Sequence, residues 1–292
     1  MITKRNTFLA ATTLLLFGCS DAGQGDATFT TWGEAYIEQQ IGPDPKGESG
    51  FIDGWTVKFE KFLVTFRNLK VASKDGEVGA TSAASFLVDN VLPGRKTLIA
   101  FKSLNAQAWN AVGFQVAPAT ADTMLVGMTP VAERDMMVAN GYSIYVQGRA
   151  FKTDAAGLKV EKTFRWGFKT ATQYSACKQA PESGREIEGI VVTNGGNDIS
   201  ELTTHGDHFF YDRLQASADP AVITALRFDA MAKADANADG EITLEELSAT
   251  PIDVRNYDPS PFEVANLGGF VTALTRTLGH FRGEGECQVA PL

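Results

Sequence analysis

The segment DANADGEITLEE, residues 235–246, places oxygen-bearing side chains at a regular spacing in a short loop. Asp235, Asn237 and Asp239 alternate along the chain, so their side-chain oxygens can converge on one point. Gly240 follows them and permits the sharp turn that such convergence requires. A hard cation such as Ca²⁺ takes roughly six to eight oxygen ligands. The residue types and their order therefore predict a binding loop for a hard cation.

This loop resembles the calcium-binding loop of the EF-hand family at every ligand position. By that resemblance, Glu241 contributes its backbone carbonyl, Thr243 a direct or water-mediated contact, and Glu246 both carboxylate oxygens. The predicted calcium ligands are Asp235, Asn237, Asp239, Glu241, Thr243 and Glu246. The sequence holds no second loop of comparable pattern, although EF-hands usually occur in pairs. A constant structural role for the calcium is therefore favoured over a regulatory one.

The three histidines of the chain, His205, His208 and His280, all lie in its C-terminal third. Three neutral imidazoles, or two with a carboxylate, form a zinc or copper site if the fold brings them together. Alternatively each histidine has a separate structural role. In that case His208 begins a helix, His280 caps a helix C-terminus, and His205 lies in a turn. The spacing leaves both interpretations open.

The first residues have the pattern of a secretory leader. Lys4 and Arg5 precede an apolar run, residues 8–17, that is too short to span a bilayer as a permanent helix. The run ends in LFGC, residues 16–19, which resembles the lipobox of bacterial lipoproteins. By that resemblance, the leader is residues 1–18.

The lipoprotein resemblance also implies how the mature chain is held. Cys19 would be acylated, and residues 19–28, which are small and polar, would tether the folded body to the lipid. We therefore expect a lipid-anchored protein of the bacterial cell envelope. Ser20 after the cysteine favours the outer membrane, with the periplasmic and surface faces both open.

Charge and cysteine content fit an exported protein. The formal net charge is −9, and loss of Lys4 and Arg5 with the leader makes it more negative, which disfavours nucleic acid and anionic lipid as partners. Besides Cys19 the chain has Cys177 and Cys287. In an oxidising compartment these two are expected to form one disulfide rather than a thiolate metal site.

The middle of the chain, roughly residues 51–195, is a series of strand-like segments separated by short turns. Residues 55–71 alternate apolar and polar side chains with changes of parity near Lys61 and Arg67, which indicate bulges. Residues 142–151 and 159–170 are predicted to form a hairpin. Strands without intervening helices predict an antiparallel β-sandwich or barrel, of which we favour the sandwich.

The last third has helical features. Asp219 is a predicted N-cap for a helix that runs into the calcium loop. The predicted fold is therefore mainly β with α: a β-sandwich domain, residues 29–200, followed by a C-terminal helical segment with one EF-hand, residues 201–292.

Three segments, SFLVDN (85–90), AVGFQVAP (111–118) and GYSIYVQGRAF (141–151), resemble in their order the strands of periplasmic copper-associated proteins of the MbnP type. The resemblance implies a β-sandwich and an association with copper. It assigns no histidine of this chain as a ligand.

No catalytic motif, such as G-x-S-x-G or H-E-x-x-H, is present, and we expect no enzymatic activity. The leading interpretation is an envelope-anchored lipoprotein with structural calcium and a non-enzymatic binding or scaffold role. The alternative is a protein that binds copper or zinc through His205, His208 and His280. The protein or small-ligand partner is not identified by the sequence.

Overall fold

The computed structural model describes residues 23–292, except residues 48, 155, 181–186 and 220. The predicted leader, residues 1–18, and the predicted lipidation site Cys19 lie outside these described residues. Strand β1 begins at Gln24, inside the segment 19–28 that was expected to be a tether. Residues 24–28 are therefore part of the folded body. No helix among the described residues is long and apolar enough to cross a bilayer.

The larger of two main sheets is curled and is organised around the long strand β2. Its strand order is β15-β9-β8-β2-β6-β10-β17, with β3 paired to β2 and β7 paired to β3. The strands are β2 (Thr56–Ala72), β3 (Val78–Asp89), β6 (Gly113–Val116), β7 (Met124–Leu125), β8 (Ile144–Thr153), β9 (Lys159–Phe168), β10 (Thr172–Ser175), β15 (Glu241–Ile242) and β17 (Gln288–Pro291). The predicted hairpin is confirmed as β8 and β9. The predicted bulges are confirmed as register shifts beside Lys61 and Arg67.

The smaller main sheet has the order β16-β14-β1-β4. Its strands are β1 (Gln24–Gly33), β4 (Lys96–Asn105), β14 (Asn197–Thr204) and β16 (Gly279–Phe281). Strand β1 pairs with β14 in parallel and with β4 in antiparallel orientation. Two short pairs complete the strands: β5 (Ala108–Trp109) with β13 (Ile190–Val191), and β11 (Lys178–Gln179) with β12 (Ile187–Glu188). The prediction of a mainly β chain is confirmed, but the parallel pairs were not expected.

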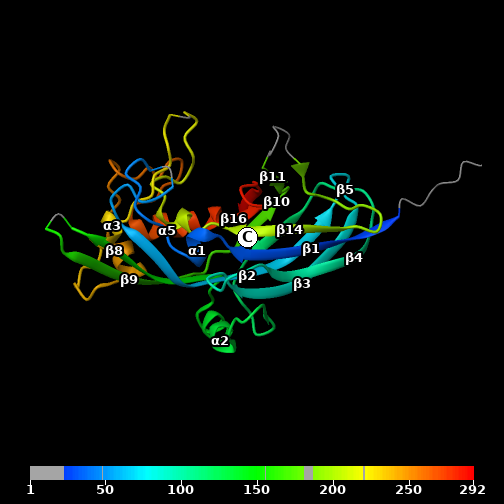
Figure 1. The fold of residues 1–292 in the computed structure, drawn as a ribbon, viewed down its shortest axis with the longest axis horizontal. Coiled ribbons are helices and arrows are strands. Elements are labelled where there is room, and N and C mark those ends of the chain that lie inside the picture. Colours follow the sequence, from blue (N-terminus) through cyan, green and yellow to red (C-terminus); the bar gives the residue numbers. More distant parts are fainter. Residues whose placement is uncertain (1–22, 48, 155, 181–186, 220) are drawn as a thin grey trace, which may run out of the picture.

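The helices are few and short. They are α1 (Ala35–Glu38), α2 (Val131–Asn140), α3 (Asp229–Ala232), α4 (Leu244–Ala249) and α5 (Leu267–Leu274), with 3-10 turns η1 (Asp207–Phe210) and η2 (Thr275–Thr277). In Figure 1, α3 and α5 lie toward the end of the molecule formed by β8 and β9, and α2 projects from the opposite side. Strands β14, β15, β16 and β17 of the last third join the main sheets. The expected helical segment 201–292 is therefore not confirmed.

The segment after Asp219 shows why the expected helical segment is not confirmed. Residues 221–228 form no helix, because their backbone groups pair with other segments. The carbonyl of Leu226 accepts from the N–H of Ile52 at 3.1 Å, and the carbonyl of Ala225 accepts from the N–H of Asp212 at 2.9 Å. Tertiary pairing overrides the local helical pattern here, and α3 begins only at Asp229.

The predicted disulfide is confirmed between Cys177 and Cys287. It joins the segment that follows β10 to the segment that precedes β17, and these two strands also pair with each other. A continuous core of buried aromatic side chains occupies the space beneath the C-terminal segments. Its members include Phe59, Phe62, Phe164, Trp166, Phe168, Phe209 and Phe210. This core supports the segment that carries two of the three histidines.

Candidate metal centre

The three histidines form one cluster. The ring centroids of His205 and His280 are 4.3 Å apart, and His208 lies 5.1 Å from each of them. Their residues are only 4%, 7% and 6% exposed, in the order His205, His208, His280. The fold therefore brings all three imidazoles together, as the alternative required. Of the separate structural roles, that of His208 at the start of a helical turn is confirmed, whereas His280 lies in a strand and does not cap a helix.

Strand pairing places two of the three rings. His205 directly follows β14, and its backbone N–H donates to the carbonyl of Leu278 at 3.0 Å. His280 lies in β16, where it is paired in antiparallel register with Thr203 of β14. Because β14 and β16 are neighbouring strands, residues far apart in sequence meet at this edge of the smaller sheet.

The third ring is placed by a tight turn into the aromatic core. Gly206 lies so close to Ile37 and Phe59 that a Cβ on it would stand 2.7 and 2.9 Å from their atoms, which only glycine permits. Turn η1 follows, with Phe209 and Phe210 fully buried. Their burial holds η1 in place and so directs the ring of His208 into the cluster.

Hydrogen bonds occupy only part of the capacity of the three rings. Nδ1 of His208 lies 2.9 Å from the hydroxyl of Thr277, which leaves its Nε2 for another partner. Nδ1 of His205 lies 3.5 Å from a carboxylate oxygen of Glu34. Within the described part of the chain, no hydrogen-bond partner reaches the buried Nδ1 of His280. A buried imidazole nitrogen beside two other imidazoles is suited to be a metal ligand.

Carboxylates surround the cluster and complete two sets of potential ligands. In one set, the ligand atoms of His205, His280 and Glu284 lie within 4.8 Å of one another. In the other set, the ligand atoms of His205, Asp207 and His208 lie within 4.8 Å of one another. One oxygen of Asp207 accepts a hydrogen bond from the Tyr211 hydroxyl at 3.1 Å, and the other is buried with no partner among the described residues. His205 is the residue that both sets share.

Burial keeps the imidazoles of His208 and His280 neutral. It lowers the pKa of His208 well below the ordinary value, and the neighbouring His280 and His205 lower it further. Burial, with a smaller contribution from His205, lowers the pKa of His280 to about 4. Burial raises the pKa of Asp207 and of Glu34, against the attraction of His205. Neutral imidazole is the metal-binding form, so His208 and His280 are ready ligands near neutral pH.

We expect the stability of the metal-free protein to rise with pH between about 4 and 6.5. In this interval the unfolded chain protonates at His280 but the folded chain does not, so the unfolded state holds more protons. The contribution of each depressed imidazole reaches about 1.4 kcal/mol per pH unit. The raised pKa of Asp207 acts in the opposite sense, because the folded chain holds that proton above the ordinary pKa of an aspartate.

Urea unfolding in the presence of a chelator, at about pH 5 and about pH 6.5, measures this dependence. His280→Gln is the comparison, since glutamine does not titrate, and its stability should change less between the two pH values. Equal changes in the two proteins would contradict the assignment of the slope to His280.

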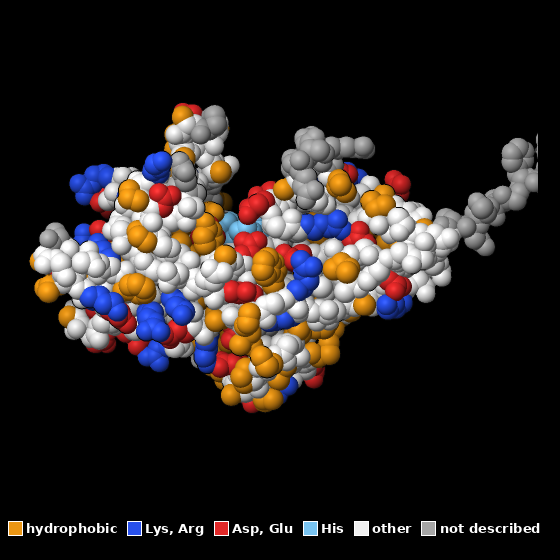
Figure 2. Space-filling view, in the orientation of Figure 1, with side chains coloured by type: hydrophobic (Ala, Val, Ile, Leu, Met, Phe, Trp, Pro, Cys, Tyr) orange, Lys and Arg blue, Asp and Glu red, His pale blue; other side chains and the backbone are white. Residues whose placement is uncertain are grey.

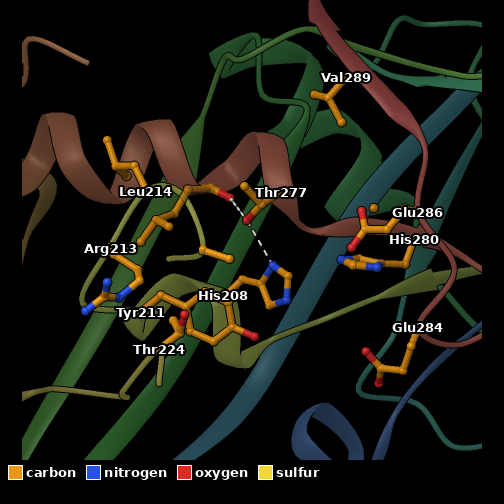
Figure 3. Close-up of a pocket in the computed structure, with 13 residues that line it drawn as sticks. His208, Tyr211, Arg213, Leu214, Thr224, Thr277, His280, Glu284, Glu286 and Val289 are labelled. Carbon is orange, nitrogen blue, oxygen red and sulfur yellow. Dashed lines mark hydrogen bonds between the residues drawn. The ribbon is translucent and has the colours of Figure 1, made fainter. Parts of the chain in front are cut away.

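A cavity of about 350 Å³ gives access to the cluster from solvent. Figure 2 shows histidine atoms at the bottom of a hollow, with acidic side chains beside them. Figure 3 shows His208 and His280 at the same space, with Glu284 and Glu286 on the side of His280. Arg213 also lines the cavity, but its guanidinium is bound to Asp212. The acidic wall favours entry of a cation.

The predicted calcium loop, residues 235–246, connects α3 to α4 away from the histidines. Asn237 accepts from the N–H of Asp239 at 2.9 Å, and Asp239 accepts from the N–H of Glu241 at 2.8 Å. The Glu246 carboxylate accepts from the N–H of Thr243 at 3.0 Å and that of Ala236 at 3.2 Å. These bonds bend the loop inward, as an ion-binding loop requires.

The flanking helices of the loop have four and six residues, so the EF-hand helices are not confirmed. Each set of three ligand atoms within 4.8 Å that the described residues contain belongs to the histidine cluster, and none includes a loop residue. Gly240 has a φ of +87°, as the predicted sharp turn needs. The side chain of Asp235 is fully buried, and its Oδ1 meets no hydrogen-bond partner among the described residues. This last atom fits a cation ligand.

The histidines have neighbours that were not identified from the sequence, namely Glu34, Glu284 and Thr277. A signal for Glu284 existed, since it follows His280 by four residues and precedes the disulfide cysteine by three. Glu34 and Thr277 gave no signal, because their contacts with the histidines depend on the pairing of distant segments. Asp212, an acidic residue near the histidines in sequence, takes no part in the site because its carboxylate binds Arg213 and Arg227.

Comparison with models of known families gives no match, and no curated protein matches the chain. Among solved structures, the chain is similar to MbnP from Methylosinus trichosporium, with 11% sequence identity and a TM-score of 0.26. The similarity covers 61% of this chain and 75% of that one. MbnP is of the type that three segments of this sequence resemble.

Proposed function

We propose that this chain is a transition-metal-binding protein that holds its ion with His205, His208 and His280. The observation that carries the proposal is the cluster of three buried imidazole rings with centroids at most 5.1 Å apart. Burial of imidazoles against one another costs free energy unless a partner compensates for it. A bound cation supplies that partner for the Nδ1 of His280 and the free oxygen of Asp207.

The ligand chemistry selects zinc or copper. Imidazole nitrogen with an accessory carboxylate suits Zn²⁺ and Cu²⁺, whereas Ca²⁺ and Mg²⁺ take oxygen ligands. Each of the two sets, His205 with His280 and Glu284 and His205 with Asp207 and His208, offers two nitrogens and one oxygen, which are ligand types found in zinc sites. Copper binds such a site more tightly than zinc by the general order of stability. We therefore propose one ion, zinc or copper, for each chain.

Elemental analysis of the chain purified from its own cells without chelator tests this function. One equivalent of zinc or copper is expected, and the triple variant His205→Gln, His208→Gln, His280→Gln should contain none. The half-buried acid Asp253, which binds Arg255, provides a control variant, Asp253→Asn, that should keep its metal. Wild-type protein without either metal, and unable to bind added metal, would show the function to be wrong.

We propose a second, structural cation site for Ca²⁺ at residues 235–246. It is supported by the buried Oδ1 of Asp235, which has no hydrogen-bond partner within the described part of the chain, and by the match to the ligand pattern of the EF-hand family.

Glu246→Gln should weaken calcium binding by about tenfold or more, because one neutral amide replaces a carboxylate expected to give two ligand oxygens. The variant should keep its transition metal, since Glu246 lies outside the histidine cluster. Calorimetric titration with CaCl₂ measures the affinity. Glu245, a neighbouring exposed acid on α4, serves as the control through Glu245→Gln. Equal calcium affinity of the Glu246 variant and wild type would contradict the ligand assignment.

We further propose that the chain works as a lipid-anchored protein of the bacterial cell envelope. The leader pattern and the LFGC segment, residues 16–19, support this location. Replacement of Cys19 by alanine should move the chain from the membrane fraction to the soluble fraction. An unchanged distribution would refute the anchor without affecting either metal site.

A further inference from the structure

Strand β9 lies beside the calcium loop and takes the place that a second loop has in paired EF-hands. β15, inside the loop, pairs with β9 in parallel, with Glu241 opposite Thr163 and Ile242 opposite Phe164. The N–H of Thr163 donates to the carbonyl of Gly240 at 2.8 Å, and the indole of Trp166 donates to the carbonyl of Ile242 at 2.9 Å. The sheet therefore fixes the shape of the loop.

Strand β9 also places two positively charged side chains, those of Lys162 and Arg165, beside the loop. The ammonium group of Lys162 binds Oδ2 of Asp235, and the side chain of Lys162 is only 20% exposed. The guanidinium of Arg165 binds the carboxylate of Glu241, with its Nε 2.9 Å from Oε1. Glu241 is expected to offer its backbone carbonyl to calcium, so Arg165 occupies a side chain that the ion does not need. Lys162, in contrast, binds a carboxylate that is expected to be a direct ligand.

The two oxygens of Asp235 are divided between different partners. Oδ2 accepts from the N–H of Gly240 at 3.0 Å and from Lys162. Oδ1 is the buried atom without a partner among the described residues, and it remains for the ion. Because the N–H of Gly240 already orients the carboxylate, Lys162 is not required for orientation. Its remaining effect is that of a positive charge held beside the cation site.

We propose that Lys162 sets the calcium affinity of the loop by holding a fixed positive charge on Asp235. The ammonium group repels Ca²⁺ in a site where burial of the Asp235 side chain reduces screening by water. It also draws electron density from the carboxylate that binds the ion. In the absence of calcium, Lys162 compensates part of the repulsion among the loop carboxylates. The loop thus stays formed when empty and binds calcium weakly, which suits a compartment rich in calcium. This inference rests on the proposed calcium site.

Calorimetric titration with CaCl₂ of the full mature chain tests the inference with three variants. Lys162→Met removes the charge and keeps the aliphatic stem, and it should bind calcium about tenfold more tightly than wild type. Lys162→Arg keeps the charge and should bind as wild type does. Lys159→Met is the matched control, because Lys159 lies on the same strand and pairs with Glu161 away from the loop. It should also bind as wild type does.

Thermal unfolding without calcium supplies a second readout. Lys162→Met should unfold at a lower temperature than wild type without calcium, and added calcium should raise its Tm by more. If Lys162→Met binds calcium as wild type does, or more weakly, the inference is overturned while the calcium site stands. If no protein of the set binds calcium, the calcium site itself falls and this inference falls with it. If Lys162→Met binds calcium and the wild type shows no binding, the inference is supported, because the charge of Lys162 would then account for the whole difference.

Discussion

Replacement of His205 by glutamine is expected to weaken zinc and copper binding by more than about a hundredfold, since changes in residues that merely support a ligand already cost about 10–100-fold. His205 belongs to both sets of ligand atoms, whereas His208 and His280 each belong to one. We therefore expect His205→Gln to lose more affinity than His208→Gln or His280→Gln. Glutamine is chosen because it keeps polar character in a buried position and removes the ring nitrogens.

Competition with a chromogenic chelator of known affinity measures these differences. Asp253→Asn again serves as the control, because Asp253 lies outside both sets of ligand atoms and the variant should keep its metal affinity. Near-ultraviolet circular dichroism of each metal-free variant shows whether the core around Phe209 and Phe210 is intact. If the three single variants bind zinc and copper as tightly as the wild type, the histidines are not the ligands.

Removal of the disulfide is expected to have the largest effect on stability. Cys177 and Cys287 are 110 residues apart, and closure of a loop of that length stabilises the folded state by up to about 4–5 kcal/mol in the chain-entropy model. The double variant Cys177→Ser, Cys287→Ser should therefore lose a large part of its free energy of unfolding. Glu284 and Glu286 lie just before Cys287 at the cavity, so metal affinity should fall as well.

Guanidinium unfolding of the metal-free double variant measures the first effect, and chelator competition measures the second. Wild-type protein unfolded in the presence of a reductant should behave as the double variant does, which separates loss of the bond from the effect of the serines. A loss of stability below about 1 kcal/mol would contradict the prediction, because it would mean that β10 and β17 hold the chain end without the bond.

Features that depend on local sequence were predicted well. The hairpin of β8 and β9 follows from alternating side chains on both sides of a short polar turn. The bulges of β2 follow from the changes of parity near Lys61 and Arg67. The disulfide follows from counting cysteines in a chain expected to be exported. Each of these rests on side-chain period or on composition, which need no knowledge of the fold.

Features that depend on distant pairing were predicted poorly. The first residues of strand β1 were expected to belong to a flexible tether. Instead β1 lies between β14 and β4 and pairs with both. Its burial depends on these strands, which come much later in the chain. The helix expected after Asp219 is replaced by pairing of Leu226 with Phe51 and Tyr211. The sequence could not decide whether the three histidines form a cluster, because this too depends on the pairing of distant strands. Only the register of β14 and β16 brings His280 to His205.

The parallel pairing of β1 with β14 has a consequence for the order in which the molecule is assembled. β1 is among the first residues of the folded body, and its partner, which leads directly to His205, is separated from it by most of the chain. Pairings of such long sequence separation form slowly, because the intervening chain must be ordered first. The histidine cluster also needs β16, near the other end of the chain. A nascent or truncated chain therefore lacks the complete histidine cluster, and the proposed ion could be bound only after β16 has paired with β14.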